Sequence, residues 1–79
     1  MPNQNIPRGH TANLGAHTVP GDLAVYGMGA PYTISINGGA AAAHVVAVGA
    51  VDTYAINGQS VSVTNTTAAP GPDNLTISW

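Results

Sequence analysis

The stretch that decides the fold of this chain is residues 51–64, which read VDTYAINGQSVSVT. Apolar and polar residues alternate on both sides of a central Asn57-Gly58 pair, as in β-strands whose successive side chains point to opposite faces. An Asn-Gly pair between two such runs is the strongest short-range signal of a β-hairpin, because its turn needs positive φ at both central residues. The stretch therefore predicts two antiparallel strands joined by a tight turn.

A two-residue turn also predicts the register of this hairpin, with Tyr54 opposite Val61 and Asp52 opposite Val63. One face then carries the apolar side chains, and we expect it to be buried: Tyr54, Ile56, Val61 and Val63. The other face carries no charge: Thr53, Ala55, Ser60, Ser62 and Thr64. Strand pairs that face solvent usually carry a charged residue that blocks edge-to-edge pairing. We therefore expect this uncharged face to be an interface.

Further alternating runs predict strands at residues 23–26, 32–36, 44–48 and 74–79, separated by segments rich in glycine and proline. The segment 65–73 contains Pro70-Gly71-Pro72, which has few backbone donors for a sheet, and we expect a loop there. No run has convincing helical periodicity. About six short strands without a helix predict an all-β fold, a small antiparallel β-sandwich or barrel.

Residues 1–20 differ from the rest, because prolines and glycines interrupt them and neither a helical nor a strand period is visible. We expect an extended N-terminal arm over residues 1–20 and a β-domain over residues 21–79. Chain ends of this composition are mobile unless something holds them. We expect a neighbouring subunit to hold the arm, with packing on its own domain as the alternative. The candidate interface residues are Asn5, Ile6, Arg8, His10, Leu14 and His17.

The charge content is the most unusual bulk property, since only 5% of the 79 residues are charged and Arg8 is the one cation. Soluble domains have about 25% charged residues. One arginine cannot neutralise a phosphate backbone or hold an anionic membrane, so we expect neither nucleic acid nor membrane as a partner. A surface this neutral is poorly protected against association. We therefore expect other protein subunits to cover much of it, in a homo-oligomer or on a different protein.

The residues able to carry chemistry are few, and they do not form a recognisable catalytic motif. Asp22 and Asp73 lie in turn contexts, where aspartate bonds to its own backbone. Asp52 is the exception, because the predicted register places it on the buried face. The histidines lack the spacing of a zinc site: His10, His17 and His44. We expect no enzymatic activity, no metal and no cofactor.

Two short patterns have simple interpretations. Asn65-Thr66-Thr67 and Asn74-Leu75-Thr76 match the acceptor pattern for N-glycosylation, which arises by chance in a chain rich in asparagine and threonine. The triplet Ile-Asn-Gly occurs at residues 36–38 and again at 56–58. We interpret the repeated triplet as a common way to end a strand rather than as an internal repeat.

In its general design the chain resembles the small β-rich decoration or cement proteins and minor structural proteins of tailed-bacteriophage virions. The resemblance covers the whole chain, with its proposed arm, compact β-domain and high content of Gly, Ala, Thr and Asn. It implies a structural virion protein that binds the capsid exterior, contacts other copies or the major capsid protein, and stabilises the shell. Such proteins are made in the host cytoplasm, in keeping with the absence of a recognisable signal peptide here. The resemblance assigns no individual residue a role.

The alternative function is that of a small carbohydrate- or surface-binding β-sandwich, which would present exposed aromatic rings. Alternation places Tyr32, Tyr54 and Trp79 on apolar faces, where we expect them in the core. Tyr26 is out of phase with its apolar neighbours and is the aromatic residue that we expect to be exposed.

Overall fold

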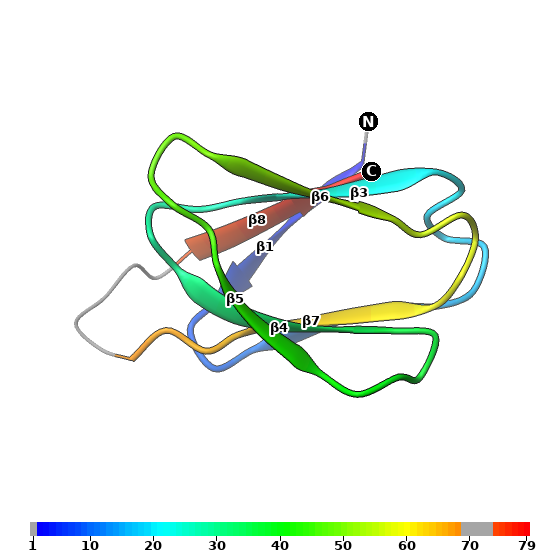
Figure 1. Ribbon diagram of the computed structural model, residues 1–79, viewed down its shortest axis with the longest axis horizontal. Coiled ribbons are helices and arrows are strands. Elements are labelled where there is room, and N and C mark those ends of the chain that lie inside the picture. The colour runs from blue at the N-terminus through cyan, green and yellow to red at the C-terminus, as the bar shows by residue number, and fades with distance from the viewer. Residues whose placement is uncertain (1, 69–73) are drawn as a thin grey trace.

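The computed structural model describes residues 2–68 and 74–79, and all regular elements of these residues are β-strands. Two four-stranded antiparallel sheets pack face to face as a sandwich, seen as the upper and lower layers in Figure 1. The first sheet has the order β1 (Asn3–Pro7), β8 (Asn74–Ser78), β3 (Asp22–Tyr26) and β6 (Val51–Ala55). The second has the order β2 (Thr11–Leu14), β7 (Val61–Asn65), β4 (Pro31–Ile36) and β5 (Ala42–Val45).

The core lies between the two sheets and is built by alternate side chains of the strands together with Val19, Val46 and Ile56 of the connections. Its fully buried large side chains are Ile6, Val19, Leu23, Val25, Tyr32, Val46, Ile56, Val63, Leu75 and Ile77. Ile36, Tyr54 and Trp79 are partly buried and pack against this cluster. The expected core positions of Tyr32, Tyr54 and Trp79 are thus confirmed.

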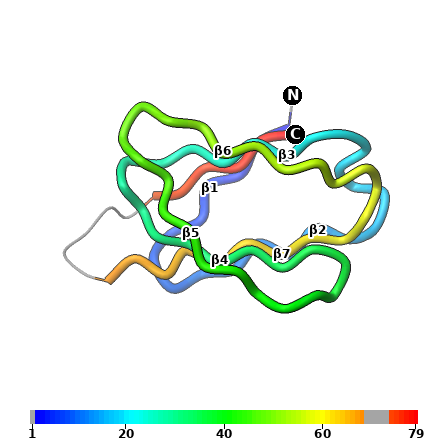
Figure 2. The backbone as a smooth tube through the Cα atoms, viewed as in Figure 1, coloured from blue at the N-terminus to red at the C-terminus, as the bar shows by residue number. Residues whose placement is uncertain are grey.

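The chain passes from one sheet to the other at every connection between consecutive strands except the one between β4 and β5 (Figure 2). Strands that follow each other in the sequence therefore mostly face each other across the core. The last strand, β8, is central and pairs with both β1 and β3. It is extended at the chain end by a hydrogen bond from the Trp79 amide to the Pro2 carbonyl, 3.0 Å long.

The turn at Asn57-Gly58 is confirmed, but the hairpin register is wrong. Both residues have positive φ, 52° and 84°, and the Gln59 amide closes the turn on the Ile56 carbonyl at 3.0 Å. However, β6 pairs with β3, whereas β7 pairs with β2 and β4, so Tyr54 does not lie opposite Val61. The turn forms an arch between the sheets. Inward and outward faces remain as predicted, because strands that meet across a core need the same alternation as a hairpin.

The structure has eight strands rather than six, in an open sandwich rather than a closed barrel. The two additional strands, β1 and β2, lie in the segment expected to be an arm, and each joins a different sheet. Ile6, Leu14 and Val19 of this segment are buried in the core. The expectation of an arm outside the domain is therefore corrected. Its strand pattern was invisible because a turn with Gly9 at φ 75° splits it into two very short runs.

The remaining strand predictions hold with small shifts. The expected strand at residues 44–48 lies earlier, as β5, and ends where Val46 turns into the core. The predicted loop at residues 65–73 starts one residue later, because Asn65 is the last residue of β7, and its Pro70-Gly71-Pro72 and Asp73 lie outside the described residues.

Candidate functional site

The candidate site is the side of the sandwich where β5 and β6, each the last strand of its sheet, leave their outer edges unpaired. We call this side the open edge (Figure 1). All four residues of β5 are exposed, while β6 alternates between exposed and half-buried side chains. The single charged residue in these two strands is Asp52.

Behind the open edge, four side chains from both sheets form a polar cluster, which we call the tyrosine cluster: Tyr32, His44, Asp52 and Tyr54. The Tyr32 hydroxyl donates to Asp52 Oδ2 at 2.5 Å and lies 2.6 Å from the Tyr54 hydroxyl. The His44 ring stacks on Tyr32, with centroids 5.8 Å apart, and meets Tyr54 edge-on at 5.9 Å. The cluster thus joins β4 and β5 of one sheet to β6 of the other.

The central hydrogen bond of the cluster, from Tyr32 to Asp52, joins the two sheets and has a structural role. Burial, followed by the hydrogen bonds to Asp52 and Tyr54, raises the pKa of the Tyr32 hydroxyl far above its usual value near 10. The Tyr32 hydroxyl therefore stays protonated and donates a hydrogen bond to the Asp52 carboxylate. A phenol with so high a pKa is a poor general acid or base near neutral pH. The expectation that Asp52 lies on the inner face is confirmed, and the consequence is that the open edge presents no outward charge.

The exposed large apolar side chains gather at one end of the sandwich, around the β3–β4 and β5–β6 connections. The two connections touch, because the Gly29 amide donates to the Val46 carbonyl at 2.9 Å. We call this surface the apolar end, and it consists of Tyr26, Met28, Val45, Val48 and Val51. Val51 pairs with Tyr26 across the β3–β6 ladder. Tyr26 is 40% exposed, so its expected exposure is confirmed.

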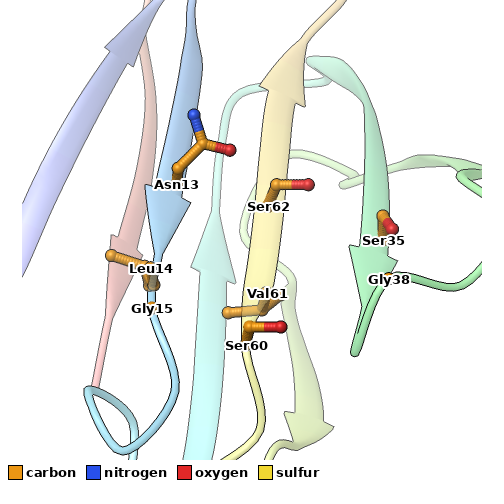
Figure 3. Close-up of a pocket in the computed structure, with 8 residues that line it drawn as sticks. All are labelled: Asn13, Leu14, Gly15, Ser35, Gly38, Ser60, Val61 and Ser62. Atoms are coloured by element: carbon orange, nitrogen blue, oxygen red, sulfur yellow. The ribbon is translucent and has the colours of Figure 1, made fainter.

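A shallow hollow of about 260 Å³ lies over β7, between β2 and β4, on the outer face of the second sheet. Figure 3 shows the hydroxyls of Ser35 and Ser62 and the amide of Asn13 around it. We call it the serine hollow, and its lining residues are Asn13, Leu14, Gly15, Ser35, Gly38, Ser60, Val61 and Ser62. Ser35 donates to the Gly39 carbonyl at 2.6 Å. The lining is polar and uncharged, as suits a small neutral molecule rich in hydroxyl groups.

The structure does not bring the six candidate interface residues of the first twenty together on one surface. Ile6 and Leu14 are buried in the chain's own core, so they are not available to a partner. Asn5 accepts a hydrogen bond from the Thr76 hydroxyl at 2.7 Å on the outer face of the first sheet. His10 and His17 are exposed in two different connections, and Arg8 is half-buried in the turn between β1 and β2.

Sequence reasoning missed the part played by Asn65, which is fully buried between the sheets. Its Nδ2 donates to the Ile6 carbonyl at 2.8 Å, while its Oδ1 accepts from the Thr67 amide and hydroxyl at 3.1 and 2.6 Å. Every hydrogen-bonding group of this side chain is directed at the protein, so Asn65 is not an accessible glycosylation site. An asparagine in phase with the inward Val61 and Val63 was the available signal.

The described residues hold no group of three or more His, Cys, Asp or Glu side chains placed to bind a metal ion. His44 belongs to the tyrosine cluster instead. The described part of the chain also has no helix of the length and apolar character needed to cross a membrane.

Comparison of this chain with protein-family models, with curated proteins and with solved structures finds no match.

Proposed function

We propose that this protein is a structural subunit of a larger protein assembly, in which neighbouring subunits cover its uncharged surfaces. The observation that carries the proposal is the open edge. The residues that β5 and β6 turn to the outer faces are Ala43, Val45, Val51, Thr53 and Ala55. Natural sheets protect exposed edges with charges, prolines or bulges. Here the only charge, Asp52, is turned inward and bound by Tyr32.

The apolar end supports the same proposal. Val48 and Met28 are 72% and 71% exposed, and Val45 and Val51 lie on the strands next to them. Contiguous exposed apolar side chains are typical of protein–protein contact surfaces. The first twenty residues lend no support, because their two strands belong to this chain's own sheets.

Within this class we propose a role as a decoration or cement protein on the exterior of a tailed-bacteriophage capsid. The support is the resemblance in composition and in the compact β-domain, together with the neutral surface, whereas the arm is no longer part of that resemblance. A protein that binds only the assembled shell stabilises it by mass action. Its partners would be further copies of this chain and the major capsid protein.

Sedimentation velocity of the purified protein tests the proposal, over concentrations from about 1 µM to about 1 mM that span weak to moderate affinities. We expect species larger than the monomer, with a fraction that rises with concentration. A protein that stays monomeric over the whole range, and does not co-sediment with phage shells, would overturn the proposal.

The serine hollow favours a second candidate function, the binding of a neutral carbohydrate. Its polar lining offers the side chains of Asn13, Ser35, Ser60 and Ser62 and carries no charge. It lacks the aromatic platform that the carbohydrate hypothesis predicts, because Tyr26 lies on the opposite sheet. A glycan array separates the two functions, since a monomer that binds sugars and loses this binding in Ser62→Trp would favour the second.

A further inference from the structure

We propose that β5 pairs with β5 of a second copy of this chain, so that the second sheets of two molecules join into one continuous eight-stranded antiparallel sheet. The inference rests on the proposed assembly function and names the contact through which assembly begins. The observation behind it is that β5 is an uncharged edge strand with all four residues exposed, and that it adjoins the apolar end.

The backbone of β5 shows which groups are free. The Val46 amide donates to the carbonyl of Ala30, the residue just before β4, and Tyr32 lies opposite His44 in the ladder. Backbone groups of successive residues in a strand point to opposite sides. Those of His44 and Val46 therefore point to β4, whereas the amides and carbonyls of Ala43 and Val45 point away from the sheet.

The free groups select one register for a symmetric pair. With His44 of one copy opposite His44 of the other, Ala43 faces Val45 twice. The two residues of each pair exchange two backbone hydrogen bonds, and all four residues lie within the β5 strands of the two copies. Pairing Ala43 with Ala43, or Val45 with Val45, would place the second free residue opposite a residue beyond the ends of β5. A two-fold contact of this kind is closed, as in most dimers.

A second copy fits this edge better than a charged partner does. β5 reads Ala-Ala-His-Val and contains no carboxylate, lysine or arginine. The chain has a formal net charge of only −2, so two copies meet with little repulsion. The small Ala43 side chain leaves the edge open to close approach, and Val45, which is 64% exposed, would be partly covered by Ala43 of the partner.

β6 is the less suitable edge of the two. It contains a carboxylate, Asp52, whereas β5 has none, and its outward residue Val51 lies opposite Tyr26 in the ladder with β3. β6 therefore provides a matched control, because it is an exposed edge strand of similar length in the same molecule.

Cysteine cross-linking gives the first test, because the chain has no cysteine of its own. In the proposed register the two copies of residue 44 are directly opposite, about 4.5 Å apart at Cα, which lies within the range for a disulfide. We expect His44→Cys to form a disulfide-linked dimer rapidly under mild oxidation, and Thr53→Cys on β6 to form little. Equal cross-linking by both variants, or faster cross-linking by Thr53→Cys, would overturn the proposal.

Proline substitution gives the second test, by sedimentation velocity. Ala43→Pro removes an amide that the chain's own sheet does not use, as edge strands tolerate, while Thr53→Pro does the same on β6. We expect Ala43→Pro to weaken self-association about tenfold or more and Thr53→Pro to leave it unchanged. Circular dichroism checks that both fold. If Ala43→Pro does not fold, Val45→Lys replaces it, with the same expected loss.

The outcomes separate this inference from the proposed function. If the β5 variants assemble as well as the wild-type protein does, the β5 contact is overturned while the assembly function stands. A wild-type protein that never assembles would overturn the proposed function itself.

Discussion

At the scale of single residues, buried polar side chains hold the two sheets together. Asn65 ties the end of β7 to the carbonyl of Ile6 in β1, and the Tyr32 hydroxyl ties β4 to Asp52 in β6. Both side chains reach strands of the opposite sheet. Buried polar groups stabilise a fold only when every partner is present, because an unsatisfied group retains its full desolvation cost.

Asn65→Ala tests the first of these bridges. The substitution leaves the Ile6 carbonyl and the Thr67 amide and hydroxyl without their buried partner, so we expect a loss of about 2 kcal/mol or more in the free energy of unfolding. Urea denaturation measures it. Asn74→Ala is the matched control, because Asn74 is exposed and we expect a change within about 0.5 kcal/mol. Equal effects of the two substitutions would contradict the bridge.

The raised pKa of Tyr32 predicts a loss of stability in alkali. Below about pH 10 the hydroxyl is protonated in both states, so its contribution is constant. Above that pH the unfolded chain ionises while the folded protein does not, and the free energy of unfolding falls by about 1.4 kcal/mol per pH unit. Urea denaturation between about pH 9 and pH 11 should show this fall. In Tyr32→Phe we expect lower stability throughout and a shallower fall; parallel curves would refute the assignment.

At the scale of elements, the two Asn-Gly turns show how far the sequence alone could predict this fold. Asn37-Gly38 and Asn57-Gly58 have the same sign of φ at both residues, and each is closed by an amide three residues beyond the preceding isoleucine. The first joins neighbours in one sheet, and the second crosses between sheets. The turn and the inward faces were readable because both are local.

The difference between hairpin and arch was not readable, because it depends on contacts from distant parts of the chain. The Gly58 amide donates to the Val19 carbonyl, and the Gly58 carbonyl accepts from the His17 amide, both at 2.7 Å. The candidate site, too, could be predicted only in its local part. The inward position of Asp52 followed from alternation, whereas its partner Tyr32 lies twenty residues away on another sheet.

The connection between β3 and β4 packs so closely that it requires glycine at position 27. A Cβ atom there would lie 2.6 Å from Val46 Cγ1 and 3.3 Å from Leu75 Cδ1, and both neighbours are buried. We expect Gly27→Ala to destabilise the protein by about 1–3 kcal/mol through overpacking. Gly21→Ala is the control, since no heavy atom lies within 4 Å of its Cβ position. Thermal denaturation compares the two, and an unchanged Gly27→Ala variant would contradict the close packing.

At the scale of the whole molecule, the strand order makes the first twenty residues part of both sheets. β1 and β2 are edge strands on the side opposite the open edge, one in each sheet. They cover β8 and β7, which would otherwise be unpaired on that side. A single segment therefore closes both sheets, which a compositional reading of its prolines and glycines did not reveal.

Deletion of residues 2–20 distinguishes an integral segment from an arm. The deletion removes the buried side chains of Ile6, Leu14 and Val19, each worth about 1.5–3 kcal/mol of burial. It also removes two strand ladders from a domain whose total stability, at about 0.05–0.15 kcal/mol per residue, is of similar size. We expect the shortened chain to be unfolded by circular dichroism, and a peptide of residues 2–20 added in trans to restore β-structure. An arm would give the opposite result, a folded domain that has lost only its self-association.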